Sequence, residues 1–260
     1  MKAYDFANIL FTGPCNLNCP HCIGRRPELR GLPENLHRFP PENLEELMEE
    51  LNRRGIREIS VTGTNTDPQL YPYERELLAR LRRGVPGARI SLHTNGVLAL
   101  EKMETFNLYD RAAVSLPSFR PETCRKMTGG SWTLPLEAIL EKARVPVKIS
   151  VLVTEDNAEE VPEILDRCEK GGVRRAALRT LYGKVRLWKV PGDLELVGDF
   201  AGSPVYRRGG LQATVWDFSR SRLKCLNLFS DGSLSDDYLL VKGRSCGDSK
   251  RRFDDAPAKE

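Results

Sequence analysis

Short apolar runs alternate with amphipathic segments through the first two thirds of the chain, and this alternation restricts the fold more than any other feature of the sequence. The runs are almost continuous in apolar residues, which is typical of strands buried on both faces of a parallel sheet. Six runs are present: Asn8–Thr12, Glu58–Thr62, Arg89–His93, Ala112–Leu116, Val147–Val153 and Ala176–Thr180. The sequence therefore predicts six parallel strands.

Helical segments lie between these runs. Pro41 and the acidic residues after it are typical of a first helical turn, and Leu44, Leu47, Met48 and Leu51 then form one apolar stripe. Comparable segments are Glu74–Arg83, Leu136–Ala143 and Glu163–Lys170. Strand–helix alternation implies right-handed crossovers, so we expect an α/β fold, a partial (β/α)6 TIM-like barrel. Functional residues should then follow the C-terminal ends of the strands.

The pattern changes after Tyr182. Residues 183–210 are rich in Gly, Pro and charge and are expected to be irregular. Further strands are expected at Leu211–Phe218, Cys225–Phe229 and, after a turn at residues 230–233, Tyr238–Val241. We interpret them as a C-terminal antiparallel β extension that closes one side of the barrel. The predicted division is a core at residues 1–182, this extension at 183–243 and a polar flexible tail at 244–260.

Composition and charge exclude several classes of protein. The net charge of +4 over 260 residues is a mild surplus and gives no strong nucleic-acid signal. No stretch approaches the roughly 20 consecutive apolar residues of a transmembrane helix, and the first apolar run is too short for a secretory signal. We therefore expect a cytoplasmic protein with no membrane partner.

Cysteine placement is the clearest chemical feature of the chain. Three of the seven cysteines, Cys15, Cys19 and Cys22, lie within eight residues directly after the first predicted strand. An odd count without a secretory signal argues against a disulfide framework and for reduced thiols that bind a metal. The two spacings allow three thiolates to converge from one loop on one inorganic centre.

The thiolate set favours some centres over others. Soft thiolates select zinc, copper(I) or iron–sulfur clusters. Structural zinc requires four closed ligands, and the local fourth candidate, His21, is adjacent to Cys22 and would point away from the shared centre. Three cysteines on a four-iron cluster leave one iron open for an exogenous ligand, whereas closed electron-transfer clusters use four.

The spacing Cys15-x-x-x-Cys19-x-x-Cys22 after the first strand of an α/β barrel resembles the radical S-adenosylmethionine (radical SAM) superfamily. The resemblance covers roughly residues 5–182, and the barrel is similar to that of the molybdopterin-cyclase and peptide-maturase branch. It implies that these cysteines hold one [4Fe–4S] cluster and that S-adenosylmethionine (SAM) chelates the open iron. It also places His21 where the family has an aromatic residue against the adenine of SAM, although a local hydrogen bond is the alternative role.

The second and third strand ends support the resemblance. The family has a Gly-Gly-Glu turn after strand two, near the methionine amino group. This chain keeps one glycine, Gly63, and has Thr64 in place of the acid. Asp67 follows, either as an acid that faces SAM or substrate or as a turn former ahead of Pro68. In the Thr-Asn-Gly turn after strand three, the resemblance directs the Thr94 hydroxyl toward SAM.

The last three strand ends carry the remaining candidates. The resemblance implies that Ser115 bonds the ribose or carboxylate of SAM and that Val153 packs by the adenine. Arg179 in a buried strand requires an anionic partner, which is the SAM carboxylate, an acidic substrate group or a structural carboxylate. Catalytic residues remain unknown, with Arg179 and Asp67 as the candidates.

The C-terminal cysteines add no second centre. Cys225 and Cys246 cannot complete another four-iron site alone, so we expect no auxiliary cluster. This weakens assignment to the GTP-cyclising enzymes and to the peptide maturases with cysteine-rich tails. Arginines after the cysteine loop and along residues 174–189 are compatible with an anionic or acidic peptide substrate, or with solvated surface.

The sequence therefore predicts a radical SAM enzyme, an oxidoreductase or lyase. Its cluster would reductively cleave SAM to a 5′-deoxyadenosyl radical that abstracts hydrogen from an unidentified substrate. A small molecule is favoured over a peptide because no peptide-recognition extension is recognised. An external electron donor such as flavodoxin or ferredoxin is implied. The alternatives are a glycyl-radical-enzyme activase and a non-catalytic metal-binding protein, either a zinc protein or an electron-transfer iron–sulfur protein.

Overall fold

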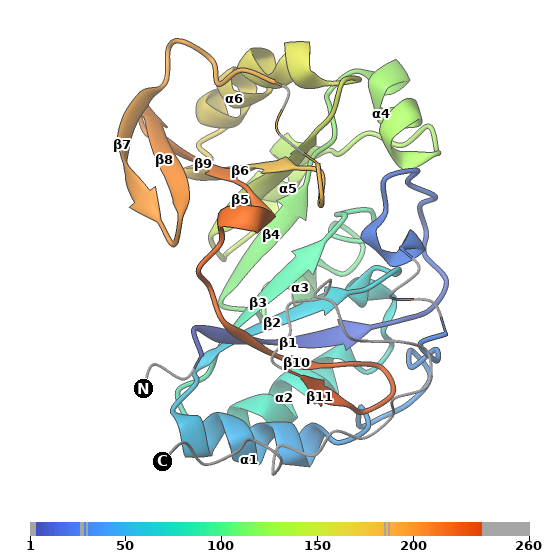
Figure 1. Cartoon of the computed structure of the whole chain (residues 1–260). Helices are drawn as coiled ribbons and strands as arrows, with labels where there is room; N and C mark the ends of the chain where they lie inside the picture. Colours follow the sequence, from blue (N-terminus) through green and yellow to red (C-terminus); the bar gives the residue numbers. More distant parts are fainter. Residues whose placement is uncertain (1–3, 27–28, 30, 185, 187, 236–260) are drawn as a thin grey trace.

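One curved sheet organises the molecule (Figure 1). The computed structural model describes residues 4–26, 29, 31–184, 186 and 188–235. Within them the sheet has eleven strands in the order β11-β10-β1-β2-β3-β4-β5-β6-β9-β8-β7. Their bounds are β1 Phe6–Phe11, β2 Glu58–Gly63, β3 Arg89–Thr94, β4 Arg111–Ser115, β5 Val147–Val153, β6 Arg175–Thr180, β7 Glu195–Phe200, β8 Ser203–Arg208, β9 Leu211–Trp216, β10 Cys225–Leu228 and β11 Leu234–Ser235.

The central strands confirm the predicted parallel core. β1 to β6 are neighbours in chain order, and each adjacent pair is parallel. The sheet is not closed, because β1 and β6 each pair on their other side with a strand from the C-terminal part. This is the partial barrel that the sequence predicts. The ends of β1 to β4 point toward the loop after β1 and toward helix α4 (Figure 1).

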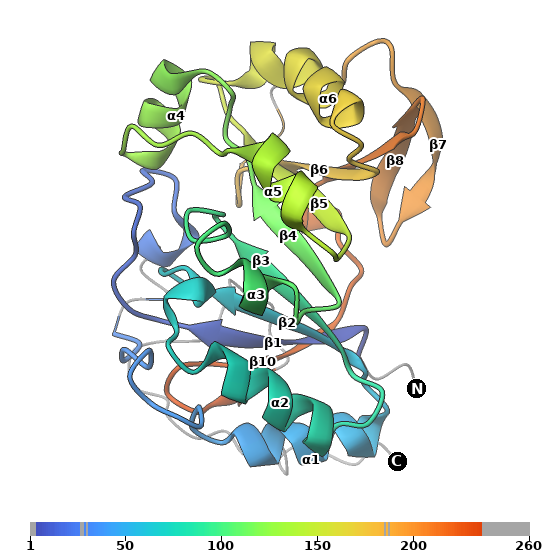
Figure 2. The ribbon, with the colours of Figure 1, turned by 180° about the vertical axis from the view of Figure 1, so that it is seen from behind.

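The helices cover the outer face of the sheet, with α1, α2, α3, α5 and α6 in front of it in Figure 2. Their bounds are α1 Leu44–Arg54, α2 Glu74–Gly84, α3 Met103–Phe106, α4 Pro121–Thr128, α5 Leu136–Lys142 and α6 Val161–Lys170. The short 3-10 turns are η1 Ile23–Arg25, η3 Pro68–Leu70, η4 Ala158–Glu160 and η5 Phe218–Arg220. None of the described helices is both long and apolar enough to cross a membrane.

The expected helix from Pro41 begins later, at Leu44. Asn43 precedes it in the left-handed region, with φ of 56°, and its side-chain amide donates to the Gly232 carbonyl at 2.9 Å. This long-range hydrogen bond fixes a non-helical residue where the local pattern predicts a helical turn. Neither α3 nor α4 was predicted. α3 is a single turn, too short to show a helical pattern.

The two faces of the sheet differ in chemistry. Alternate strand residues such as Ile59, Val61, Ile90 and Leu92 pack into one large core against the helices. The residues between them face the inside of the curve and are mostly small or polar: Ser60, Ser91, His93, Ala113, Ser115, Ser150 and Ala177. The inner face is therefore a polar lumen bordered by the strand ends.

The C-terminal part departs from the prediction in its placement. β7 and β8 lie in the range expected to be irregular, and they form an antiparallel hairpin at the sheet edge. Their sequence lacks the apolar alternation of a half-buried strand because β7 is exposed along most of its length. β8 and β9 pair antiparallel, as do β10 and β11. However, β9 joins β6 and β10 joins β1, both in parallel, so the extension adds strands to both edges instead of one.

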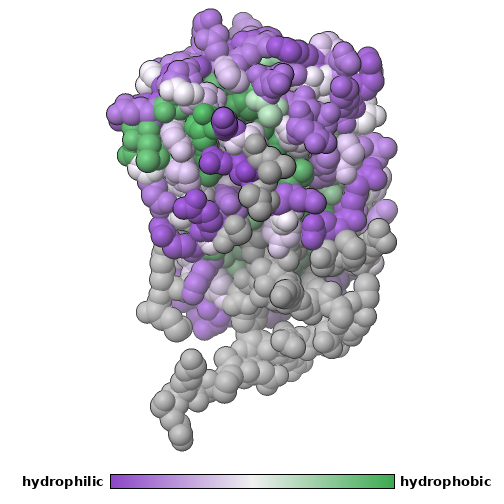
Figure 3. Space-filling model, turned by 45° about the horizontal axis from the view of Figure 1, so that its top comes forward, coloured by the Kyte–Doolittle hydropathy of each residue, from purple (hydrophilic) through white to green (hydrophobic). Residues whose placement is uncertain are grey.

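Apolar surface at this edge is visible from above. The face drawn in Figure 3 is mainly hydrophilic, and apolar surface gathers at its left, on the side of the β7–β8 hairpin. β7 exposes Leu196 and Phe200 there. The predicted strand Tyr238–Val241, the tail 244–260 and Cys246 lie outside the described residues. The division of the chain near residue 182 stays a prediction.

Candidate functional site

The cysteine loop follows β1 and is fixed by neighbouring strand ends. The Gly13 N–H donates to Asn65 Oδ1 at 3.1 Å, and Thr66 Oγ1 donates to the Pro14 carbonyl at 2.5 Å. On the other side, the Asn18 N–H donates to the carbonyl of Thr128 at the end of α4, at 2.9 Å. The loop is therefore held at both ends of its length by the residues after β2 and after β4.

The three thiols border one cavity and affect one another. Burial raises the pKa of Cys19 to about 11, and the neighbouring Cys22 and Cys15 raise it further by repulsion between thiolates. Burial also raises the pKa of Cys15. Three neighbouring thiols can all be deprotonated only if a cationic centre offsets the repulsion between the thiolates. Soft thiolates select iron–sulfur clusters, zinc or copper(I) as that centre.

The thiols surround a space instead of meeting at a point. In the described part of the chain, no three His, Cys, Asp or Glu side chains are gathered so as to hold a single metal ion. A four-iron cluster places each thiolate on a different iron, so it fits ligands spaced around a cavity. The cysteine set therefore fits such a cluster in both chemistry and arrangement.

The cavity lies inside the barrel at the strand ends and measures about 560 Å³. Its lining comes from the cysteine loop, from the residues after β2, and from β3 to β6. Besides the three cysteines, the lining includes Thr62, Gly63, Thr64, Asp67, His93, Thr94, Asn95, Ala113, Ser115, Ser150 and Arg179. Most of the predicted site residues are thus brought together, from six different segments of the sequence.

Gly63 and Thr64 form the turn after β2. The Thr64 N–H donates to the Phe11 carbonyl at 2.7 Å, which joins the turn to β1. The Thr64 hydroxyl is buried and has no hydrogen-bond partner within the described chain. A Cβ on Gly63 would lie 1.8 Å from the Thr66 carbonyl oxygen, so the turn closes too tightly for any side chain at this position.

Replacing Gly63 with alanine is expected to lower the free energy of unfolding by about 3 kcal/mol, because the new methyl group meets backbone that cannot move aside. Urea unfolding followed by circular dichroism measures the change. Gly130→Ala is the matched control, since a Cβ there meets nothing within 4 Å. Equal stability of the two variants would contradict the tight turn.

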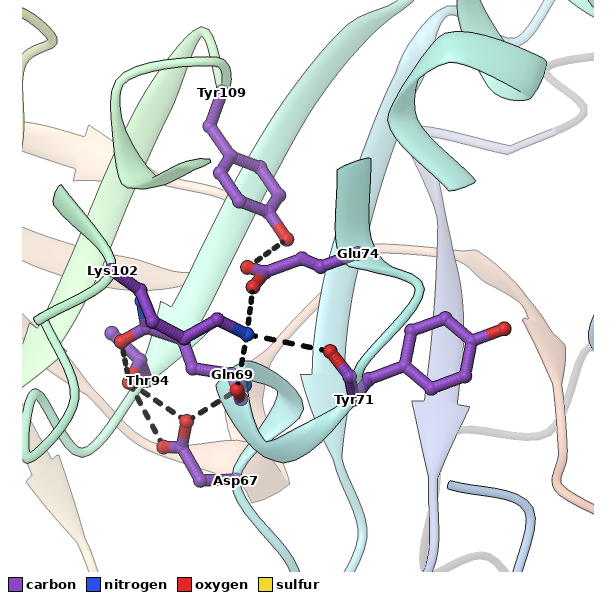
Figure 4. Close-up of polar contacts among 7 residues, drawn as sticks. All are labelled: Asp67, Gln69, Tyr71, Glu74, Thr94, Lys102 and Tyr109. Atoms are coloured by element: carbon purple, nitrogen blue, oxygen red, sulfur yellow. Dashed lines mark hydrogen bonds and ion pairs between the residues drawn. The ribbon is translucent and has the colours of Figure 1, made fainter. Parts of the chain in front are cut away.

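Asp67 is a buried structural acceptor. Only 3% of the residue is exposed, and its carboxylate accepts a hydrogen bond from Thr94 Oγ1 at 2.9 Å (Figure 4). It also accepts from the backbone N–H groups of Gln69 at 2.9 Å and Asn95 at 2.6 Å. Burial raises its pKa, while these hydrogen bonds oppose the rise. Asp67 thus caps η3 and holds the turn after β3, which is the turn-forming role that the sequence left open.

Thr94 is turned inward by the same contact. Its hydroxyl donates to Asp67 and accepts from Gly96 N at 3.0 Å, and 3% of the residue is exposed. The resemblance implied a hydroxyl directed at SAM, and the structure instead pairs it with a carboxylate. The 68–71 turn beneath is fixed by Lys102, whose Nζ lies 2.7 Å from Glu74 Oε2 and donates to the Gln69 carbonyl at 2.5 Å (Figure 4).

Other predicted residues lie in different places. Ser115 is exposed on the inner face of the barrel and lines the cavity, as does Arg179 at the end of β6. Val153 faces the opposite way, into the core beneath the helices. His21 is half-buried on the cysteine loop and is not among the lining side chains of the cavity.

Lys148 and His93 were missed as site residues. Both lie on the inner face. His93 on β3 pairs in register with Ala113 on β4, which in turn pairs with Lys148 on β5, so the two residues flank Ala113. Desolvation, followed by the positive charges of Arg179 and Arg111, lowers the pKa of Lys148 to about 8. Desolvation and the charges of Lys148 and Arg179 lower the pKa of His93 to about 3.

The basic side chains of this face differ in whether an acidic group pairs with them. Arg111 forms an ion pair with Glu58. Lys148 and His93 make no hydrogen bond or ion pair with any residue that the structure describes. A lysine inside an otherwise apolar run, two residues before a cavity-lining serine, is the sequence signal that could have identified the first of them.

Comparison with known proteins places the chain in a family. The family model of the radical SAM superfamily matches residues 9–168. Among relatives of known sequence, a probable GTP 3′,8-cyclase of Methanococcus aeolicus is 29% identical over 177 residues, which cover 64% of this chain and 56% of the relative. A probable GTP 3′,8-cyclase of Thermococcus kodakarensis is 31% identical over 173 residues, covering 63% and 53%. The chain spans about half the length of these relatives.

Solved structures show the same fold. Streptococcus suis SuiB bound to the precursor peptide SuiA superimposes with a TM-score of 0.54 at 16% identity, over 68% of this chain and 40% of that chain. The structure described as native anSMEcpe with bound AdoMet gives 0.52 at 17% identity, over 70% and 54%. The matched family spans more than half of the sequence and contains the three cysteines. The chain therefore belongs to the radical SAM superfamily, whose enzymes use a [4Fe–4S] cluster and S-adenosylmethionine.

Proposed function

We propose that this protein is a radical SAM enzyme whose substrate is an anionic small molecule bound inside the barrel. Cys15, Cys19 and Cys22 hold the cluster. When bound, cluster and SAM supply a 5′-deoxyadenosyl radical that takes hydrogen from the substrate. The observation that carries the choice of substrate is the positive charge of Lys148 on the inner face of the barrel, which pairs with no carboxylate in the described part of the chain.

The electrostatics of the lumen favour an anion. The charges that shift the pKa values of Lys148 and His93 are all positive. Glu58, at the start of β2, is already paired with Arg111 and with Arg89. A phosphate or carboxylate in the lumen would offset the repulsion at Lys148 and would form a charge-assisted hydrogen bond with its ammonium group.

Depth in the barrel suggests how such a substrate is oriented. Lys148 pairs in register with Arg175, which lies four residues before Arg179 along β6. Four residues of strand span about 13 Å. Arg179 lines the cavity beside the cysteines, whereas Lys148 is not a lining residue and lies deeper on the inner face, toward the starts of the strands. An elongated substrate would place its anionic group deep in the barrel and its reacting carbon toward the cysteine loop.

The remaining lining residues bind and orient SAM and the substrate. Gly63 lines the cavity through the tight turn after β2, and the buried Thr64 hydroxyl is available to a polar group of SAM. Ser115 projects a hydroxyl into the cavity from β4. The small side chains at Ala113 and Ala177 leave room for the substrate between the strands. The reducing electron comes from an external protein donor, and the enzyme works in the cytoplasm.

Nucleoside triphosphates are the first substrates to test. The named relatives are GTP 3′,8-cyclases, and a triphosphate matches a lumen with separated cations. GTP, ATP and inorganic triphosphate together separate recognition of a base from recognition of phosphate alone. The likeness to peptide-bound SuiB concerns the fold, so it does not change this choice.

Calorimetric titration of the cluster-loaded protein with these three compounds tests the proposal. We expect binding by the unaltered protein and at least about tenfold weaker binding by Lys148→Met, since a charge-assisted hydrogen bond is lost. Lys170→Met is the matched control, because Lys170 is exposed and paired with Asp166 at 2.7 Å. Absence of binding to the unaltered protein, or equal weakening by both variants, would contradict an anion site at Lys148.

A further inference from the structure

Asn95 connects the turn after β3 to the cysteine loop. Its side-chain carbonyl accepts from Val97 N at 3.0 Å, which orients the amide. Its Nδ2 then donates to Asn16 Oδ1 at 2.7 Å and lies 3.9 Å from Cys15 Sγ. Both polar atoms of the Asn95 side chain therefore have partners, and its amide N–H groups point at Cys15 and Asn16.

The backbone of Asn95 is fixed from behind. Asp67 accepts the Asn95 N–H at 2.6 Å, the shortest of its backbone hydrogen bonds, and also the Thr94 hydroxyl. Lys102 holds the turn that carries Gln69, and Glu74 pairs with Lys102 (Figure 4). Hydrogen bonds thus connect the helices, through the buried Asp67 carboxylate, to the backbone of the residue whose side chain reaches Cys15.

We infer that Asn95 is a positioning residue for Cys15, and that its amide N–H group raises the reduction potential of the cluster bound there. The inference rests on the proposed function, because it requires Cys15 to be a cluster ligand. N–H donors to ligand sulfur stabilise the reduced, more negatively charged state of an iron–sulfur cluster. The donor is carried by a rigid turn, so its effect persists without SAM or substrate.

Asn95→Ala and Asn95→Asp test the two parts of this role. Alanine removes the donor. Aspartate keeps the acceptor for Val97 N but replaces the N–H group by a negative oxygen beside Cys15. Asn107→Asp is the matched control, since Asn107 fixes an exposed turn in the same way, accepting from Arg144 N at 2.7 Å and donating to the Lys142 carbonyl at 3.2 Å.

The measurement is a redox titration of the reconstituted cluster, followed by electron paramagnetic resonance, without SAM or substrate. We expect a lower midpoint potential in Asn95→Ala, a still lower one in Asn95→Asp, and the original value in Asn107→Asp. Circular dichroism and iron content accompany each sample. A folded Asn95 variant that takes up no iron, under conditions that load the unaltered protein, supports the positioning role.

Folded Asn95 variants that load iron and keep the original potential would overturn the inference and leave the proposed function intact. Failure of the unaltered protein to take up an iron–sulfur cluster would instead remove the proposed function itself. The two failures are therefore distinguishable in one set of samples.

Discussion

Replacement of Cys19 by alanine is expected to give a folded protein that takes up no four-iron cluster and forms no detectable 5′-deoxyadenosine. Cys19 lines the cavity together with the other two thiols, and two remaining thiolates cannot hold the cluster. The fold should persist, because Cys19 lies on a loop fixed by backbone contacts of other residues. Iron and sulfide analysis after anaerobic reconstitution measures the loss.

Cys168→Ala is the matched control for this change. Cys168 is buried in α6 beneath the sheet, far from the cavity lining, and its pKa is raised to about 12 chiefly by burial. This variant should be less stable because a core side chain is truncated, yet it should bind as much iron as the unaltered protein. Full iron content in Cys19→Ala would show that the loop cysteines are not the ligands.

Replacement of Lys148 by methionine is expected to stabilise the ligand-free protein while it weakens anion binding. The lowered pKa of Lys148, about 8, means that folding disfavours its charged form. Methionine fills similar space without the charge, so the free energy of unfolding at pH 7 should rise by about 2 kcal/mol, after allowance for water in the cavity. Such a gain in stability at the expense of function is common where binding sites hold uncompensated charge.

The stability difference between Lys148→Met and the unaltered protein should depend on pH. The folded-state pKa of Lys148 lies below the ordinary value of 10.5, so the cost is complete below pH 8 and disappears as pH rises to 10.5. The advantage of the methionine variant should therefore shrink over that interval. Denaturant unfolding at pH 7 and pH 9.5 measures it, with Lys170→Met as the exposed control. A methionine variant that is less stable than the unaltered protein at pH 7 would contradict the account.

The sheet was predictable because its strands carry a strong local signal. β5, at Val147–Val153, coincides with its predicted bounds, and the other five core strands agree within two residues. β7 and β8 were not predictable in this way, because an exposed hairpin at an edge needs no apolar alternation. The start of α1 also escaped prediction, since the conformation of Asn43 is set by contact with Gly232, 189 residues away.

The grouping of the three loop cysteines was predictable from the sequence, and the orientation of the polar residues around them was less so. Spacing on one loop is enough to bring Cys15, Cys19 and Cys22 to one cavity. Thr94 was expected to face SAM, but the direction of its hydroxyl depends on Asp67, which comes from another strand end. The importance of Lys148 depends on its having no ion pair with a carboxylate of the described residues, which only the folded sheet reveals.

Reductive cleavage of SAM tests the central claim most directly. The protein is reconstituted anaerobically with iron and sulfide, reduced with dithionite and mixed with SAM, and the products are quantified. We expect 5′-deoxyadenosine and methionine to form with the unaltered protein and not with Cys19→Ala. A protein that holds one zinc ion, or a cluster that is unaffected by SAM and yields no 5′-deoxyadenosine, would contradict the assignment of this site to radical SAM chemistry.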